Sequence, residues 1–282
     1  MKKENNTPNY RNYLNLDALL NAQKLISEKR GKTAHDEMLF IITHQVYELW
    51  FKQILFEIDS IFEVFHAKVI DESQVGIAVS RIHRINEIIQ LLIDQIKILE
   101  TMTPMDFLEF RDLLTPASGF QSGQFRQIEN KIGLRKDSRH VYGGKDYKTK
   151  VHQDDLNKVL ESEKSESLFT LIEKWLERTP FLASEDYNFW EQYKAAVSKM
   201  IFNDKKIIEE NDVLDDAEKE SYFNQYNATE KMFNSLFNES VFNKMIDEGQ
   251  FRLSYKATHA ALLILLYRDQ AILHNPYRLL SK

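Results

Sequence analysis

The chain has 282 residues, of which 43% are hydrophobic and 12% aromatic, enough for one large domain or two ordinary ones and too apolar for a disordered protein. Its formal net charge of −6 argues against nucleic acid as the main partner, and the absence of cysteine excludes disulfides and thiolate metal sites. It has no apolar run of the roughly 20 residues that a membrane span requires, and its start lacks the apolar stretch of a secretory signal. We therefore expect a cytoplasmic protein without a membrane partner.

Glycine and proline are scarce, at 8 and 5 residues, and long segments without them carry apolar side chains at helical spacing. The predicted helices, in chain order, are Leu16–Ile26, His35–Phe65, Ser73–Glu100, Met105–Leu114, Asp154–Arg178, Ser184–Asn211, Asp215–Ile246 and Phe251–Ala271. We predict an all-α fold, a single domain over residues 1–282. It would be a large helical bundle with an N-terminal arm over residues 1–30 and a helical-hairpin insertion over residues 154–246.

Two local signals mark the starts of helices within this pattern. Thr103 followed by Pro104 is typical of an N-cap and a first helical position. Ser118, three residues before Gln121, matches a capping box and predicts a further helix start.

Other charged groups suggest structural roles. Glu63-x-x-His66 is the only motif of the kind that helical di-iron sites use in pairs, so we predict no metal centre bound by side chains alone. Glu48 and Lys52 are spaced for an ordinary helical ion pair. Residues 135–153 are basic and predict a surface loop.

Four side chains on two predicted helices are candidates for a binding site. Phe40 and His44 are four residues apart on the central helix, and Phe107 and Arg111 are four apart on the short helix, so each pair shares a helix face. If the helices meet, the pairs would enclose an apolar slot with one imidazole and one guanidinium. Such a slot suits a flat aromatic ligand with a carboxylate, which Arg111 would bind in bidentate fashion.

The spacing alone favours a purely structural role for these residues over a binding site. A histidine on an apolar helix face is more often a core residue with its hydrogen bonds satisfied. Arg111 could simply pair with Asp112 or Glu109. The residues by themselves leave this alternative open.

Four segments resemble tryptophan 2,3-dioxygenases. They are HDEMLFIITHQVYELWFKQILFE, FRDLLTPASGFQSGQFRQIENKIG, WLERTP with NFW, and FRLSYKATHAALLILLYRD. The similarity runs in order from Tyr10 to Leu280, and the first two segments are long and specific.

This resemblance implies an all-α homotetramer, a dimer of dimers, that uses haem b. Its reaction would add both atoms of O2 across the indole C2–C3 bond of L-tryptophan to give N-formylkynurenine, the first step of tryptophan catabolism by the kynurenine pathway. The resemblance also assigns the site residues. The substrate would contact Phe40, Ile41, Ile42, Thr43, His44, Phe107, Arg111 and, from a neighbouring subunit, Tyr10 and Tyr13; Ser118 would lie near the haem edge.

Within these assignments, His44 would meet the indole N–H as the catalytic residue, and Arg111 would hold the substrate carboxylate. The family's proximal haem ligand follows the segment that corresponds to PYRLL, and neither His259 nor His274 matches it. Since the sequence ends at Lys282, we expect a chain truncated before that ligand. The alternative is a haem-free or truncated relative that binds tryptophan without turnover.

Overall fold

The computed structural model describes residues 8–67, 70, 72–135, 138–139, 148, 150–178 and 189–267. All of the regular elements in these ranges are helical, which confirms the predicted all-α fold class. The α-helices are α1 (Tyr10–Tyr13), α2 (Leu16–Leu20), α3 (Ile26–Lys29), α4 (Glu37–His66), α5 (Glu72–Leu99), α6 (Pro104–Leu114), α7 (Gly123–Ile132), α8 (Gln153–Lys164), α9 (Leu168–Glu177), α10 (Phe189–Glu209), α11 (Asp216–Ser235), α12 (Glu239–Asp247) and α13 (Tyr255–Tyr267), with a 3-10 turn η1 (Gly119–Gln121) before α7.

The helices group into two compact units. The first comprises Met1–Val64 and Ser80–Leu168, and the second comprises Phe65–Val79 and Phe169–Lys282. The candidate site lies in the first unit. A single domain with an insertion over residues 154–246 stays a prediction.

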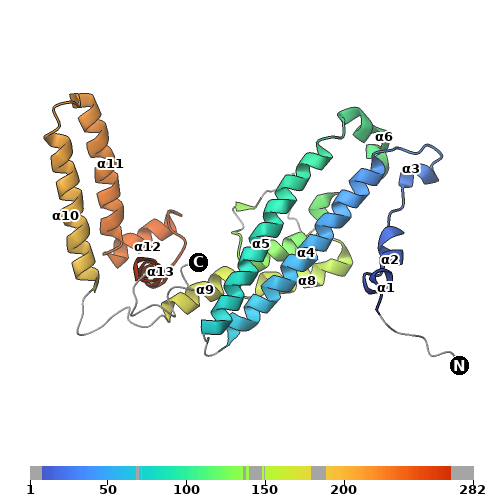
Figure 1. Ribbon diagram of the computed structural model, residues 1–282, viewed down its shortest axis with the longest axis horizontal. Coiled ribbons are helices and arrows are strands. Elements are labelled where there is room, and N and C mark those ends of the chain that lie inside the picture. Colours follow the sequence, from blue (N-terminus) through green and yellow to red (C-terminus); the bar gives the residue numbers. More distant parts are fainter. Residues whose placement is uncertain are drawn as a thin grey trace. The chain divides into compact units, whose positions relative to one another are not determined.

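The central helix forms an antiparallel pair with the next one, and Figure 1 shows α4 and α5 side by side. Apolar side chains of α4 with at most 1% exposure, Ile54, Ile58 and Ile61, give the helix its core face. Between them lies Glu57, whose buried carboxylate accepts from Arg84 of α5 at 2.6 Å. Because a buried charge is costly unless it is paired, this contact fixes how α5 meets α4.

Three predicted helices are interrupted in the structure, and one of them, Asp215–Ile246, forms α11 and α12, with Asn238 as the N-cap of α12. Of the segment Leu16–Ile26 only α2 and the first residue of α3 are helical, because the side-chain amide of Asn21 donates to the Asp17 carbonyl at 2.7 Å and so takes the acceptor that a longer helix would use. The segment Asp154–Arg178 forms α8 and α9. There Ser165 is the C-cap of α8 with an extended backbone, and its hydroxyl donates to the Ser162 carbonyl at 3.0 Å.

Both predicted caps are present. Thr103 caps α6 in a capping box with Asp106, as its sequence context indicates. Ser118 forms a capping box with Gln121, but the element that it opens is the three-residue turn η1. The longer helix α7 has its own N-cap, Ser122, whose hydroxyl accepts from the Phe125 N–H at 3.1 Å.

Helices α7 and α8 pack closely in the first unit. The buried Asn130 of α7 donates to the Val159 carbonyl at 3.2 Å and to the Ser162 hydroxyl at 2.9 Å. At the start of α7, a Cβ added to Gly123 would lie 2.6 Å from the Cβ of Asp155, which real Cβ atoms do not tolerate. Gly123 therefore permits the close approach of the two helices.

The second unit has a small apolar core of its own. Leu176 of α9 packs with Ala257, Ala260 and Ile264 of α13. A separate hairpin of α10 and α11 is visible in Figure 1 and is tied by Lys205 and Glu230 at 2.5 Å. Among the described residues, no helix is long and apolar enough to cross a membrane.

Several predicted segments fall partly outside the part of the chain that the structure describes. They are residues 1–7 of the N-terminal arm, most of the basic loop over residues 135–153, the predicted helix Ser184–Asn211 before Phe189 and the predicted helix Phe251–Ala271 beyond Tyr267.

We expect Gly123→Ala to lower the free energy of unfolding by about 1–3 kcal/mol, because the added methyl group forces α7 and α8 apart. Chemical denaturation measures this change. The control is Lys158→Ala on an exposed position of α8, which should change the free energy by less than about 0.5 kcal/mol. Equal stability of Gly123→Ala and the parent would show that the helices can separate without cost.

Candidate functional site

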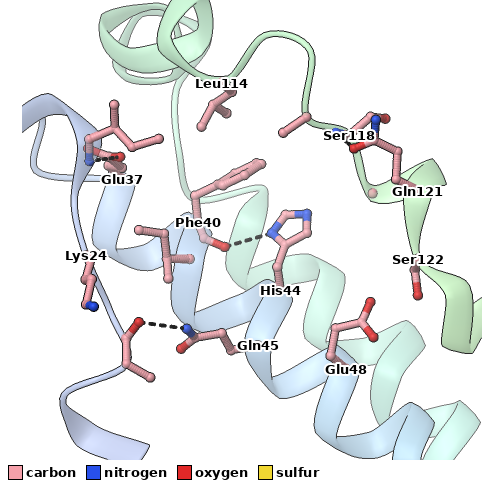
Figure 2. A pocket seen from close by; sticks show the side chains of 15 residues that line it. Lys24, Glu37, Phe40, His44, Gln45, Glu48, Leu114, Ser118, Gln121 and Ser122 are labelled. Atoms are coloured by element: carbon pink, nitrogen blue, oxygen red, sulfur yellow. Dashed lines mark hydrogen bonds between the residues drawn. The ribbon is translucent and has the colours of Figure 1, made fainter. Parts of the chain in front are cut away.

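A pocket of about 440 Å³ opens in the first unit between α4, the segment before α3, and the segment that joins α6 to α7. Figure 2 shows these three walls and the side chains between them. The pocket is lined by Ala22, Lys24, Ile26, Glu37, Phe40, Ile41, His44, Gln45, Glu48, Leu114, Ala117, Ser118, Gly119, Gln121 and Ser122.

The imidazole of His44 has one nitrogen fixed by its own helix. Its Nδ1 lies 2.7 Å from the Phe40 carbonyl oxygen, which can only accept, so Nδ1 carries the proton. In the neutral ring Nε2 is then a hydrogen-bond acceptor. Figure 2 shows the ring projecting from α4 toward the segment that carries Ser118. There, a Cβ added to Gly119 would lie 3.9 Å from Nε2, so the lone pair of Nε2 faces a wall without a side chain.

The two predicted residue pairs meet through their aromatic rings. The ring centroid of Phe40 lies 4.1 Å from that of His44 and 5.9 Å from that of Phe107 on α6. The buried Phe110 packs edge-on against both phenylalanines, at 5.6 Å from Phe40 and 5.4 Å from Phe107. The contact between α4 and α6 that the slot requires is therefore present, and it is aromatic.

Arg111 lies beside this aromatic cluster with its guanidinium exposed. Its Cζ is 5.9 Å from the centroid of the Phe107 ring. Among the described residues it forms no ion pair with Asp112 or Glu109, and Glu109 instead lies 3.9 Å from Lys32. The structure therefore does not show the ion pair with Asp112 or Glu109 that a purely structural role of Arg111 would use. The exposed guanidinium is accessible to a ligand. Neither Arg111 nor Phe107 lines the 440 Å³ pocket itself.

The remaining predicted site residues divide into two groups. Ile41 and Ser118 line the pocket, from α4 and from the segment opposite. Ile42 is exposed and Thr43 is buried, and neither lines the pocket. Tyr10 and Tyr13 on α1 are also outside the lining and are 76% and 79% exposed.

Glu37 contributes to the site in a way that its sequence context does not indicate. Its side chain is fully buried, and its carboxylate accepts from the backbone N–H groups of Ile26 at 2.7 Å and Ser27 at 3.0 Å. Gln45 makes a second attachment, donating to the Ala22 carbonyl at 3.4 Å. The segment before α3 is thereby held on α4 as a pocket wall.

Burial opposes the charge on Glu37, but the hydrogen bonds from the Ser27 side chain and from the backbone of Ile26 and Ser27 outweigh it. They hold the pKa of Glu37 below its ordinary value of 4.5. The ionised carboxylate is therefore the form that the folded state favours.

The predicted ion pair between Glu48 and Lys52 is not formed. The Glu48 carboxylate instead accepts from the side-chain amide of Gln124 on α7 at 2.8 Å, and the same amide donates to the Glu48 backbone carbonyl at 2.9 Å. The partners are 76 positions apart, so no local pattern could have indicated the contact.

Sequence comparison finds a matching family model and similar known proteins. Residues 1–282 match the model of the tryptophan 2,3-dioxygenase family. The chain is 52% identical to the tryptophan 2,3-dioxygenase of Bdellovibrio bacteriovorus over 96% of its own length and 76% of that protein. It is 46% identical to that of Dictyostelium discoideum (96% and 68%) and 43% identical to that of Alteromonas mediterranea (100% and 78%).

We expect Glu37→Gln to lower the free energy of unfolding at pH 7 by about 1–3 kcal/mol, because the amide cannot accept from both backbone N–H groups. Since folding lowers the pKa of Glu37, its stabilisation is complete above pH 4.5 and is lost as the pH falls through the folded-state value. Denaturation from pH 7 to pH 3 should therefore show the difference between parent and variant narrowing below pH 4.5. A constant difference would contradict this role, and Glu28→Gln at an exposed position is the control.

Proposed function

The chain belongs to the tryptophan 2,3-dioxygenase family, and on that basis we propose that its pocket orients L-tryptophan for haem-dependent oxidation by O2 to N-formylkynurenine. The observation that carries the proposal is the fixed tautomer of His44, which leaves Nε2 as an acceptor inside an apolar pocket. An indole N–H is a hydrogen-bond donor and could donate to Nε2. The dioxygenase names of the relatives favour this enzyme over a haem-free protein that only binds tryptophan.

His44 orients the indole in this proposal and does not need to remove its proton. The imidazole Nε2 accepts from the indole N–H, while Nδ1 stays bound to the Phe40 carbonyl. Phe40 and Ile41 supply apolar surface around the indole ring and exclude water from it. Ile42 and Thr43 act on the site through the helix that positions these side chains.

Arg111 binds the substrate carboxylate. Its guanidinium is exposed, forms no ion pair among the described residues, and lies against Phe107, which in turn packs on Phe40. This chain of contacts connects the carboxylate-binding group to the helix that binds the indole. A guanidinium suits the task because it can hold both carboxylate oxygens at once.

The described residues fit the distal side of a haem site. The pocket wall combines apolar side chains with the imidazole of His44, and Gly119 has no side chain to fill the space beside Nε2. Ser118 would hold the haem edge through its hydroxyl group. Haem would supply the activation of O2 when bound, and the protein would supply orientation and exclusion of water.

The assembly in this proposal is a homotetramer. Tyr10 and Tyr13 expose their rings on α1 and would reach into a neighbouring subunit's pocket. On α4, Ile42, Leu49 and Phe56 recur every seven residues and are exposed, which forms an apolar stripe on one helix face. Such a stripe supports burial against a second copy of the chain.

The proposed reaction is tested by incubating the haem-loaded protein with L-tryptophan and O2 and measuring N-formylkynurenine by its absorbance. Formation of the product at a rate that scales with enzyme concentration supports the proposal. If the protein binds tryptophan tightly but forms no product, the proposed dioxygenase activity is wrong and the protein only binds tryptophan.

We expect His44→Ala to lower kcat/KM for L-tryptophan by up to about tenfold, the effect of one lost hydrogen bond of about 0.5–1.5 kcal/mol. With 1-methyl-tryptophan, which has no indole N–H to donate, the parent and the variant should have similar kcat/KM values. Steady-state kinetics with both substrates measures the difference. Abolished turnover of both substrates in His44→Ala would show that His44 does more than accept this hydrogen bond.

We expect Arg111→Ala to raise KM for L-tryptophan by about 10- to 100-fold, because a charge-assisted hydrogen-bonded pair contributes about 1.5–3 kcal/mol. Arg111→Lys keeps the charge without the bidentate geometry and should fall between the parent and Arg111→Ala. Tryptamine, which lacks the carboxylate, is the matched control, and its KM should not change. An unchanged KM for L-tryptophan in Arg111→Ala would refute the assignment.

A further inference from the structure

The segment between α6 and α7 forms the wall of the pocket that faces His44, and two of its hydrogen bonds lie within the segment. Ser118 N–H donates to the Gln121 side-chain oxygen at 3.1 Å, and the Gln121 amide donates to the Pro116 carbonyl at 3.3 Å. These bonds give the segment its shape, but they do not set its distance from α4. That distance decides how much room lies between Nε2 and Gly119.

Gln124 connects this wall to α4 at the point where α7 begins. Its side-chain nitrogen donates to the Glu48 backbone carbonyl at 2.9 Å and to the Glu48 carboxylate at 2.8 Å. Glu48 lines the pocket and lies one helical turn after His44. Gln124 lies two residues after Ser122, which also lines the pocket. The bond therefore joins the two walls next to the group that meets the ligand.

We infer that Gln124 and Glu48 form a positioning pair that sets the width of the pocket between His44 and Gly119. The inference rests on the proposed function, since the width matters because the indole must fit against Nε2. Neither residue needs to touch the reacting atoms. The amide uses its donor capacity on two acceptors of one residue, so it fixes both the distance and the direction of approach of α7.

A second contact between the same helices provides a matched control. Lys131, near the end of α7, forms an ion pair with Asp59 of α4, away from the residues that line the pocket. Removing it weakens the packing of α7 on α4 without changing the pocket wall. A purely structural role of Gln124 would make the two contacts equivalent.

The first experiment measures hydrogen–deuterium exchange of the backbone amides of residues 117–121, which requires neither haem nor turnover. In Gln124→Leu these amides should exchange about tenfold faster than in the parent, because the wall loses its hydrogen bonds to Glu48 and keeps only the packing of Phe125 on Phe51 beside them. In Lys131→Met they should exchange as in the parent. Gln124→Asn, which keeps the amide but is too short to reach Glu48, should behave as Gln124→Leu and serves if the leucine variant does not fold.

The second experiment measures kinetics of the haem-loaded protein. Gln124→Leu should lower kcat/KM for L-tryptophan by about tenfold, and the loss should shrink in a His44→Ala background because the pair acts through His44. Lys131→Met should retain the parental value.

The outcomes separate the inference from the proposed function. A parent protein that folds normally but makes no N-formylkynurenine would overturn the proposed dioxygenase function. The hydrogen–deuterium exchange of the backbone amides would still decide the role of Gln124. Equal exchange in Gln124→Leu and the parent, or equal effects of Gln124→Leu and Lys131→Met, would overturn the positioning pair.

Discussion

The hydrogen bond between the His44 imidazole and the Phe40 carbonyl is the constraint on which the site depends. It connects two residues one helical turn apart, so the regular backbone of α4 places the Phe40 carbonyl within reach of the imidazole. It determines which ring nitrogen can accept from a ligand, and it holds the imidazole against the Phe40 ring. The chemistry of the pocket is therefore set by the backbone of the most central helix.

Side chains of α4 also attach the other pocket walls. Glu37 holds the backbone at Ile26 and Ser27, and Glu48 holds Gln124 of α7. These acidic groups precede and follow His44 along the same helix. Each wall is thus attached to α4 by its own acidic side chain, and the two attachments share no residue.

The parts of this arrangement that depend on local spacing could be predicted from the sequence. The predicted pairing of Phe40 with His44 requires only helical periodicity, and the Thr103 cap requires only neighbouring residues. The interruption at Asn21 was not predicted, because it arises from a side chain that competes for a backbone carbonyl within an otherwise helical pattern. The contact between Glu48 and Gln124 depends on the tertiary fold, which no window of sequence contains.

Gly119 offers a way to separate folding from ligand recognition. A methyl group at this position would lie 3.9 Å from Nε2 of His44, an ordinary van der Waals distance, and the backbone there is not in the left-handed region. The fold would accept the methyl group, yet it would occupy the space in front of the acceptor nitrogen. An alanine here would thus narrow the pocket of about 440 Å³ only beside His44, and a single carbon atom would probe recognition at this nitrogen while the fold stays intact.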